Sequence, residues 1–457
     1  MNRAPLLLAA LMILLTRPAF AITWEITTVD GPGDVGAYAS IALDPSGRPA
    51  ISYCASATDD LKFARFDGVS WHAETVDAAN RTGWYTSLAF DASGDPRIAY
   101  WDLSASALRY ARWSAGTWTK ETVDNAAYVG QCCSLALDHS GNPCISYYDY
   151  TNGDLKYARF DGVSWHIEVV EDGAAGMGAG LYTSLALDSQ DRPHISHADH
   201  TTGQLRYAHW DGAQWIRESV DGGTPIGTSI ALDENDVPRI SYAYQFGQGS
   251  HLKYASRTGP GDTWVTQIVR PGGQKGLYSS LRLVPGGDPR ILSWDLGNGI
   301  VQYNSYEDGG WIHEDVEAMG WTDQWCSLAL DAQSRPHAAY RSATEQDLHY
   351  ACDALASGLT DPFAPEPGSP AFVLRSLGNP SDIAGTVTLR LDLEHGATVR
   401  LSVVGVTGRQ VAEPVTQTFA AGASAFTLPA DLPAGVYLVR AEGDGGQRAA
   451  LRVVLMR

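Results

Sequence analysis

Apolar and polar residues alternate over short stretches along most of this chain. In Ser134-Leu135-Ala136-Leu137-Asp138, small or polar residues alternate with leucine, and a period of two is typical of a half-buried β-strand. Similar stretches begin at seven serines: Ser40, Ser87, Ser134, Ser184, Ser229, Ser280 and Ser327. The intervals between these serines are 47, 47, 50, 45, 51 and 47 residues. Such a period fits a four-stranded blade, so we predict an all-β fold built on a seven-bladed β-propeller.

Each repeat then passes through the same positions, which predict three further strands. A proline opens the second strand, where its fixed φ and missing amide donor are tolerated: Pro49, Pro96, Pro143, Pro193, Pro238, Pro289 and Pro336. The third strand carries an aromatic residue: Phe63, Tyr110, Tyr157, Tyr207, Tyr254, Tyr303 and Tyr350. The fourth strand opens with tryptophan and has valine five residues later, as in Trp71 and Val76. Because these residues recur in blade after blade, we expect them to pack one blade against the next.

The last repeat ends at residues 348–351 without a fourth strand. Trp24 and Val29, near the start of the chain, have the same five-residue offset as the six complete Trp–Val pairs. We therefore predict that the N-terminal strand completes the seventh blade beside residues 327–351. Such closure leaves no free sheet edge. The propeller should occupy residues 22–353.

A proline-rich stretch separates the repeats from a different C-terminal pattern. Residues 354–370 contain Asp361-Pro362, Glu366-Pro367 and Ser369-Pro370, which predict a semi-extended linker. Beyond it, Val387, Leu389, Leu391 and Leu393 alternate with polar residues, as do Val399, Leu401 and Val403. We predict a small antiparallel sandwich over residues 371–457.

This C-terminal segment resembles the type IX secretion sorting domain and the related immunoglobulin-like domain of flagellar hook-capping proteins. The matching features are Asn379-Pro380, residues 399–403, Gly408-Arg409-Gln410-Val411, residues 432–439 and the basic end Met456-Arg457. The resemblance covers about one fifth of the chain. It implies an immunoglobulin-like fold, the outer-membrane secretion machinery as a partner, and a location at the cell surface or outside the cell. The alternative is a terminal sandwich that only packs or spaces.

The first 21 residues have the pattern of a secretory signal peptide. Arg3 supplies the positive charge, residues 6–15 form an apolar core, and Ala19-Phe20-Ala21 is a small-x-small cleavage signal. The apolar run is short for a membrane span, and no later segment is long enough. The formal net charge of −20, without a basic stripe, argues against a nucleic-acid partner. We expect a secreted or surface-displayed monomer.

Six cysteines lie at Cys54, Cys132, Cys133, Cys144, Cys326 and Cys352, which allow fifteen pairings. Their spacing matches neither a zinc ribbon nor a haem site. Cys54 should end the second strand of the first blade, and Cys326 should begin the first strand of the seventh. We predict a Cys54–Cys326 disulfide that staples the ring closure.

Two sets of side chains should gather where the longer loops meet, on the face that holds the ends of the second and fourth strands. Aromatic residues come just before the first strand: Tyr38, Tyr85, Tyr182, Tyr278 and Trp325. Aspartates come just after the second strand: Asp102, Asp149, Asp199 and Asp295. Such a rim suits stacking on sugars and hydrogen bonding to hydroxyls, or a cationic peptide. The alternative is packing for the aromatics and turn capping for the aspartates.

Three other patterns suggest chemistry more weakly. Residues 149–154 are rich in oxygen ligands and could hold calcium, but a plain turn is the simpler interpretation. His194, His197 and His200 resemble a metal triplet, yet residues 194 and 197 of a strand point to opposite faces, so we predict no metal site and no cofactor. The repeated serines lack a Gly-x-Ser-x-Gly elbow, and a local hydroxyl hydrogen bond explains them better.

The Asp-Gly-x-x-Trp turns, such as residues 161–165, weakly resemble the Asp-box of sialidase-type propellers. The resemblance implies a shared architecture and not a shared reaction. We therefore favour a non-catalytic recognition module that binds a glycan, a peptide or another envelope component. The alternatives are a glycoside hydrolase that uses two rim carboxylates, and a structural spacer or assembly unit.

Overall fold

The computed structural model describes residues 22–354 apart from 80, 174–177, 248, 260, 319 and 321–324. In the C-terminal part it describes residues 372–376, 388–393, 396–405, 410–420, 422–427, 435–444 and 448–455. The chain forms two compact units, which divide between Ala356 and Ser357. The expected signal peptide and all but the first residue of the expected linker lie outside the described residues.

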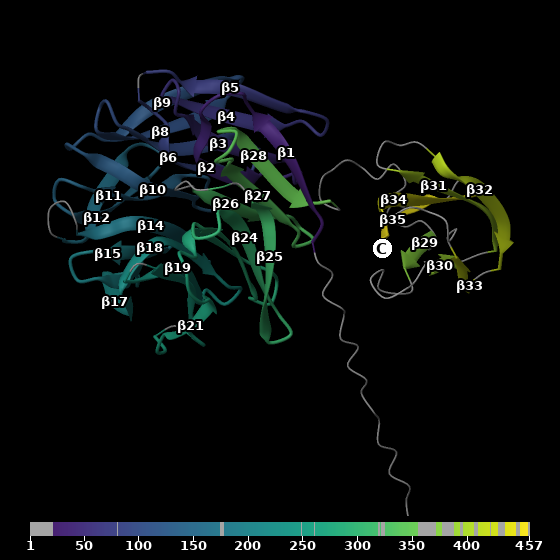
Figure 1. Ribbon diagram of the computed structural model, residues 1–457. Coiled ribbons are helices and arrows are strands. Elements are labelled where there is room, and N and C mark those ends of the chain that lie inside the picture. Colours follow the sequence, from purple (N-terminus) through teal and green to yellow (C-terminus); the bar gives the residue numbers. More distant parts are fainter. Residues whose placement is uncertain are drawn as a thin grey trace, which may run out of the picture. The chain divides into compact units, whose positions relative to one another are not determined.

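The first unit contains seven antiparallel sheets of four strands each, arranged around a central axis (Figure 1). We number them as blades 1 to 7, with strands 1 to 4 running outward from the axis. Blade 1 comprises β2 (Val35–Leu43), β3 (Pro49–Ala55), β4 (Asp60–Phe66) and β5 (Trp71–Asp77). Blade 2 comprises β6 (Trp84–Phe90), β7 (Pro96–Asp102), β8 (Ala107–Ser114) and β9 (Thr117–Asp124). Blade 3 comprises β10 (Val129–Leu137), β11 (Pro143–Asp149), β12 (Asp154–Phe160) and β13 (Trp165–Glu171).

The remaining four blades follow the same order. Blade 4 comprises β14 (Ala179–Leu187), β15 (Pro193–Asp199), β16 (Gln204–Trp210) and β17 (Trp215–Gly222). Blade 5 comprises β18 (Thr224–Leu232), β19 (Pro238–Phe246), β20 (Gly249–Ser256) and β21 (Val265–Arg270). Blade 6 comprises β22 (Leu277–Leu283), β23 (Pro289–Asp295), β24 (Ile300–Glu307) and β25 (Gly310–Ala318). Blade 7 comprises β26 (Cys326–Leu330), β27 (Pro336–Arg341), β28 (Leu348–Asp353) and, as its fourth strand, β1 (Trp24–Asp30).

The N-terminal strand closes the ring, as the repeat count predicts. β1 pairs antiparallel with β28, with Trp24 opposite Asp353 and Thr27 opposite Tyr350. Figure 1 shows these two strands side by side, although they come from opposite ends of the propeller sequence. Blade 7 therefore ties both ends of the propeller together, and β28 has no free edge.

Tryptophans of the fourth strands pack on the aromatic residues of the neighbouring third strands. In all seven cases the ring centroids lie 5.1–5.7 Å apart in an edge-to-face arrangement: Phe63–Trp118, Tyr110–Trp165, Tyr157–Trp215, Tyr207–Trp264, Tyr254–Trp311, Tyr303–Trp24 and Tyr350–Trp71. Each aromatic pair contributes about 0.5–1.5 kcal/mol beyond its buried area. Trp24 completes the set, which explains why the sequence needs a tryptophan there.

The repeated serines link the blades at the axis. The Oγ atom of each accepts a hydrogen bond from the amide that follows the corresponding serine of the next blade, at 2.9–3.2 Å. Ser40 thus accepts from Leu88, and Ser327 accepts from Ile41 across the closure. The expectation of a local hydrogen bond was wrong, because the acceptor reaches across to a neighbouring blade. A serine is needed seven times because the ring has seven inner junctions.

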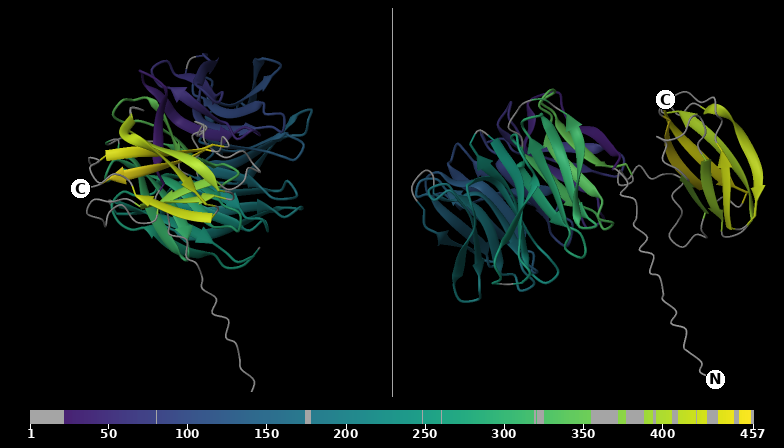
Figure 2. Two further views of the ribbon diagram at one scale, coloured as in Figure 1. Left: turned by 90° about the vertical axis from the view of Figure 1, so that its right-hand side faces the viewer. Right: turned by 60° about the horizontal axis from the view of Figure 1, so that its bottom comes forward.

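The second unit holds two antiparallel sheets. One contains β29 (Phe372–Ser376), β30 (Thr388–Leu393) and β33 (Gly422–Thr427). The other contains β32 (Gln410–Phe419), β31 (Ala397–Gly405), β34 (Gly435–Gly443) and β35 (Arg448–Leu455). β29 contacts β35, and Leu391, Val399 and Val439 are fully buried, which fits a small sandwich (Figure 2). Across the described residues of both units, no helix is long and apolar enough to cross a membrane.

Candidate functional site

The five aromatic residues that the sequence pattern places before the first strands lie on one face of the propeller. Tyr38, Tyr85, Tyr182 and Tyr278 lie inside β2, β6, β14 and β22, and Trp325 directly precedes β26. Strands 1 and 3 of a blade run in the same direction, so their starts share a face with the ends of strands 2 and 4. We call this the mouth face. The loops that enter each blade and the turns between strands 2 and 3 therefore meet there, around the axis.

A backbone irregularity turns the four tyrosines into the axis. The register of strand 1 against strand 2 shifts at this point in six blades, for example between Ala37 and Ser40. The residue two positions before the repeated serine has a positive φ: Tyr38 54°, Tyr85 53°, Cys132 53°, Tyr182 52°, Gly227 66° and Tyr278 50°. Trp325 occupies the same position in blade 7, directly before β26. Bulges of this kind redirect a side chain and are frequent near functional sites.

Five non-glycine residues in this conformation represent stored strain of roughly 1–3 kcal/mol each. Glycines two residues earlier make the bend possible. A Cβ on Gly83 would stand 2.7 Å from the Cα of Leu61, and one on Gly180 would stand 2.8 Å from that of Leu155. Each such glycine presses the start of strand 1 against strand 3 of the preceding blade, which fixes where the next aromatic residue points.

The neighbouring blade holds the strained residues in place. Thr86 Oγ1 donates to the carbonyl of Tyr38 at 2.9 Å, and Thr228 Oγ1 donates to that of Tyr182 at 2.7 Å. Two cysteines make the equivalent hydrogen bond. Cys133 Sγ donates to the carbonyl of Tyr85 at 2.9 Å, and Cys326 Sγ donates to that of Tyr278 at 3.3 Å. Hydrogen bonds that compensate strain in this way indicate a preorganised arrangement.

The five aromatic rings meet at the axis and form one group, the mouth cluster: Tyr38, Tyr85, Tyr182, Tyr278 and Trp325. Trp325 contacts the other four, with centroid distances of 4.6 Å to Tyr278, 5.5 Å to Tyr85, 5.8 Å to Tyr38 and 6.3 Å to Tyr182. All five side chains are half-buried. Burial raises the pKa of Tyr38 and of Tyr85 above the ordinary value, so both hydroxyls stay neutral. The structure thus brings these five residues together, and they form an aromatic floor on the axis.

More aromatic residues than the sequence pattern indicated lie beside the cluster. Trp84 stacks 5.2 Å from Tyr38 and also contacts Trp101, which lies 6.0 Å from Tyr85. On blade 3, Tyr128 and Tyr150 are 50% and 46% exposed and lie 6.2 Å from each other. These residues do not recur in every repeat, so a search for repeated positions misses them.

The four predicted aspartates are buried and cap their own turns. Asp149 accepts from the amide and the side-chain nitrogen of Asn152, and Asp199 accepts from Thr201 and Thr202. Asp102 accepts from Ala105 and lies 3.1 Å from Arg109. Asp295 accepts from Asn298 and contacts Lys275. Their oxygens are therefore engaged within the protein, which matches the turn-capping alternative.

The predicted disulfide is absent, because both thiols point elsewhere. Cys54 and Cys326 are free, as are the other four cysteines. Cys54 Sγ donates to the carbonyl of Thr82 in blade 2, whereas Cys326 Sγ donates toward blade 6. Although the two residues belong to adjacent blades, their side chains face opposite neighbours.

The three histidines of blade 4 also have separate partners. His197 bonds to Glu171 at 3.1 Å and His200 to the carbonyl of Pro225 at 3.1 Å. His194 Nδ1 lies 2.5 Å from the Tyr207 hydroxyl. In the candidate calcium loop, Asp154 accepts from the amide of Gly173. Within the described residues, no group of three His, Cys, Asp or Glu side chains could hold a metal ion.

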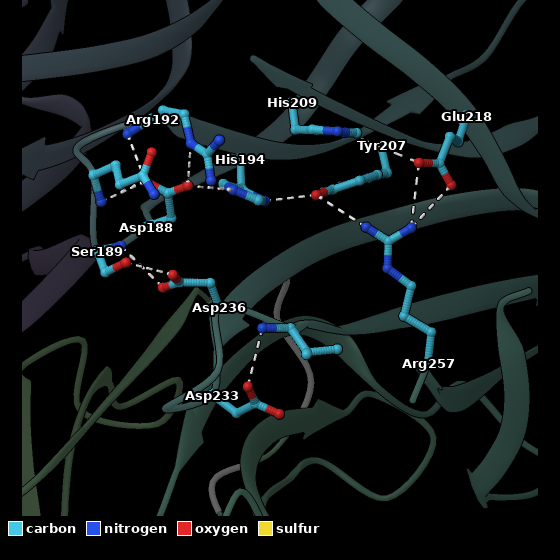
Figure 3. Close-up of polar contacts among 12 residues, drawn as sticks. Asp188, Ser189, Arg192, His194, Tyr207, His209, Glu218, Asp233, Asp236 and Arg257 are labelled. Atoms are coloured by element: carbon cyan, nitrogen blue, oxygen red, sulfur yellow. Dashed lines mark hydrogen bonds and ion pairs between the residues drawn. The ribbon is translucent and has the colours of Figure 1, made fainter. Parts of the chain in front are cut away.

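A second polar network connects blades 4 and 5 on the opposite face. Figure 3 shows its chain of contacts, which runs from Asp188 through His194 and Tyr207 to Arg257 and Glu218. Arg257 is 4% exposed, and its guanidinium lies 4.7 Å from the centre of the Trp264 ring. Every charge drawn here has a partner, so the network serves to hold the junction.

Comparisons with known proteins show the fold. No protein-family model matches the chain, and no curated protein matches it. An ulvan lyase of polysaccharide lyase family PL25 superposes with a TM-score of 0.52 at 13% identity, covering 71% of this chain and 94% of the lyase. The ulvan lyase bound to -[GlcA(1-4)Rha3S]- gives a TM-score of 0.52 at 12% identity over the same shares. The sialidase NanB of Streptococcus pneumoniae gives 0.40 at 13% identity, covering 72% of this chain and 71% of the sialidase. The shared β-propeller does not by itself indicate a shared activity.

Proposed function

We propose that this protein is an exported recognition module whose mouth cluster binds a glycan by stacking aromatic rings against sugar faces. The observation that carries the proposal is the convergence of five half-buried aromatic side chains on the axis, four of them tyrosines held at positive φ. A purely structural ring would be built more simply without this repeated strain. Aromatic residues with one apolar face and one polar end suit a partner that is itself apolar on one side.

The exposed pair on blade 3 extends the proposed surface. Tyr148 lies 6.2 Å from Tyr150, which in turn contacts Tyr128. Exposed tyrosines on loops held by a rigid scaffold are typical of binding surfaces. Together with the mouth cluster they would accommodate several successive sugars, so we favour an oligosaccharide over a monosaccharide.

The hydrolase alternative has less support from the geometry. A glycosidase needs a carboxyl group that donates a proton and a second carboxylate at a set distance. The rim carboxylates of Asp102, Asp149, Asp199 and Asp295 are instead engaged with turn amides, side chains and cations. We therefore favour recognition without catalysis.

A glycan array, with and without calcium, tests the proposal on the mature chain from residue 22. Tyr85→Ala and Tyr182→Ala should each weaken binding about 10- to 30-fold, the effect of removing a central aromatic contact. The matched control is Tyr306→Ala, which removes a tyrosine at the far end of a third strand, away from the mouth. The absence of glycan binding, or equal loss in the control, would overturn the proposal. Release of reducing or unsaturated sugar ends would show an enzyme instead.

The C-terminal unit would direct export and surface retention. The sorting-domain resemblance and the proline-rich linker support this role, since a spacer keeps the propeller clear of the export machinery. In a bacterium with a type IX system, removing residues 371–457 should leave the propeller in the periplasm. Unchanged surface display of the shortened chain would contradict this role.

A further inference from the structure

A carboxylate of blade 6 contacts the residue that would become the mature N-terminus. The backbone nitrogen of Ile22 lies 2.6 Å from Glu314 Oε1. Ile22 directly follows the expected cleavage signal Ala19-Phe20-Ala21. Its side chain packs, with that of Trp24, against the hydrophobic cluster shared by blades 6 and 7.

The repeats show what Glu314 does in place of an indole contact. At some junctions the equivalent residue of the fourth strand bonds to the tryptophan indole of the next blade, as Glu74 does to Trp118 at 2.9 Å and Glu218 to Trp264 at 3.1 Å. The indole nitrogens of Trp24, Trp165 and Trp215 are instead buried without a hydrogen-bond partner. At the Trp24 junction, Glu314 contacts the backbone nitrogen of Ile22.

The surroundings of Glu314 favour an additional positive charge. A cavity of about 340 Å³ is lined by Ile22 and by Arg290, Glu307, His313, Glu314, Arg335 and Asp353. Three carboxylates face two arginines there. Arg290 forms an ion pair with Glu307 at 3.2 Å, and Arg335 forms one with Asp331 at 2.6 Å. Burial lowers the pKa of His313, so it adds no charge at neutral pH. Burial, with Glu307 and Asp353 nearby, raises the pKa of Glu314.

We propose that hydrolysis of the Ala21–Ile22 bond creates an N-terminal ammonium group that docks on Glu314 and fastens blade 7 to blade 6. A signal peptidase would catalyse this hydrolysis, and a water molecule would supply the added atoms. Ala21 gains the carboxylate, and the Ile22 amine takes up a proton. Before the cut, the neutral amide of Ile22 can only donate one hydrogen bond. After it, the site gains one positive charge beside the carboxylates of Glu314, Glu307 and Asp353.

The inference depends on the proposed export of the protein and not on the proposed glycan binding. Its consequence is that the contact between Ile22 and Glu314 is weaker in the precursor, so the ring becomes most stable only after processing. β1 is the outermost strand of blade 7 and the first strand of the chain. Cleavage just before β1 can therefore control how firmly the ring closes.

The experiment compares two forms of the mature chain, one beginning at Ile22 and one carrying an extra alanine before it. A fusion protein cleaved without leaving residues supplies the first form. We expect the folding equilibrium constant to be about tenfold larger for the Ile22 form. The pKa of its α-amino group should rise about one unit above the usual value of about 7.7–8.0, as read from the pH dependence of amine labelling.

Glu314→Gln should abolish both differences, whereas Glu74→Gln, the same position at an ordinary junction, should preserve them. Equal stability of the two forms, or an unshifted α-amino pKa in the Ile22 form, would overturn the docking. N-terminal sequencing of the exported protein that finds a first residue other than Ile22 would overturn the processing step. Loss of glycan binding leaves both readouts unaffected, so this test is separate from that of the proposed function.

Discussion

Six of the seven blade junctions share one buried arrangement, and the junction between blades 5 and 6 lacks it. In the six, an acid at the end of strand 4 bonds to a tyrosine or histidine in strand 2 of the next blade and to a lysine, arginine or histidine in strand 3. These junction triads are Asp30/Tyr53/Lys62, Asp77/Tyr100/Arg109, Asp124/Tyr147/Lys156, Glu171/His197/Arg206, Asp221/Tyr242/Lys253 and Glu317/Tyr340/His349. Between blades 5 and 6 the same positions hold Arg270, Ser293 and Gln302.

All three members change together at that junction, which indicates that the triad acts as a unit. A buried acid without its cation, or a cation without its acid, would be an uncompensated charge. At the exceptional junction Gln302 bonds to Asp315 of its own blade at 2.9 Å, and the Arg270 Nε atom is buried without a partner. This junction is therefore held by aromatic packing and the serine hydrogen bond, and we expect it to open first.

The largest expected effect comes from breaking a regular triad. Asp124→Ala removes the close partner of Lys156, which is 9% exposed, and the acceptor of the Tyr147 hydroxyl, and it leaves Lys156 with Asp149 at 3.8 Å. The protein should lose about 3 kcal/mol of unfolding free energy, because a buried charge loses its close partner. Denaturant titration of the mature chain measures it.

The matched control for that variant is Asp315→Ala at the exceptional junction. It removes a single hydrogen bond to Gln302 and should reduce the unfolding free energy by only about 1 kcal/mol. Equal losses in the two variants would show that the triad contributes no more than this hydrogen bond within blade 6.

A second comparison sets blade 4 against blade 1 on the face opposite the mouth. His194 of blade 4 occupies the position of Ala50 in blade 1, and burial lowers the pKa of His194 to about 4. The unfolded histidine titrates at about 6.5, so below that pH the unfolded chain binds one more proton and stability falls until pH about 4. The loss over this range amounts to about 3 kcal/mol.

His194→Ala should therefore flatten the decline of unfolding free energy between pH 6.5 and 4 by up to about 1.4 kcal/mol per pH unit. The variant also loses the contact with Tyr207, so its stability at pH 7 should be lower. An unchanged slope in His194→Ala would show that His194 is protonated in the folded protein.

The sequence predicted the repeating parts of this molecule better than the parts that break the repeat. Seven serines and one displaced tryptophan were enough to predict seven blades and their closure, because packing groups recur wherever the same junction recurs. The mouth aromatics were found for the same reason. Their strained backbone was not predicted, because a positive φ at Tyr85 depends on the approach of Gly83 to another blade.

Contacts between blades also explain the errors. The partner of six repeated serines lies about one repeat away along the chain, and that of Ser327 lies at the other end of the propeller sequence, so a local hydrogen bond was the natural but wrong expectation. Cys54 and Cys326 lie in adjacent blades, yet the direction of each thiol depends on side-chain geometry that spacing does not contain. The exception at Arg270 was visible in the sequence, but its meaning required knowing that residues 270, 293 and 302 face one another.

The smallest expected effect, and the sharpest test of the comparison, comes from installing the missing triad. In the combined variant Arg270→Asp, Ser293→Tyr and Gln302→Lys, the new lysine would lie between two carboxylates, since Asp315 already contacts residue 302. We expect about 1 kcal/mol of added stability, because the gain from pairing is largely offset by desolvation of the new charges. Hydrogen exchange should slow most in β21 and β23, which border the junction. Ser293→Tyr alone should destabilise the protein, because Ser293 is 2% exposed and the larger ring would meet Arg270 without an acceptor for its hydroxyl. If the combined variant is no more stable than this single one, the three residues do not act as a unit.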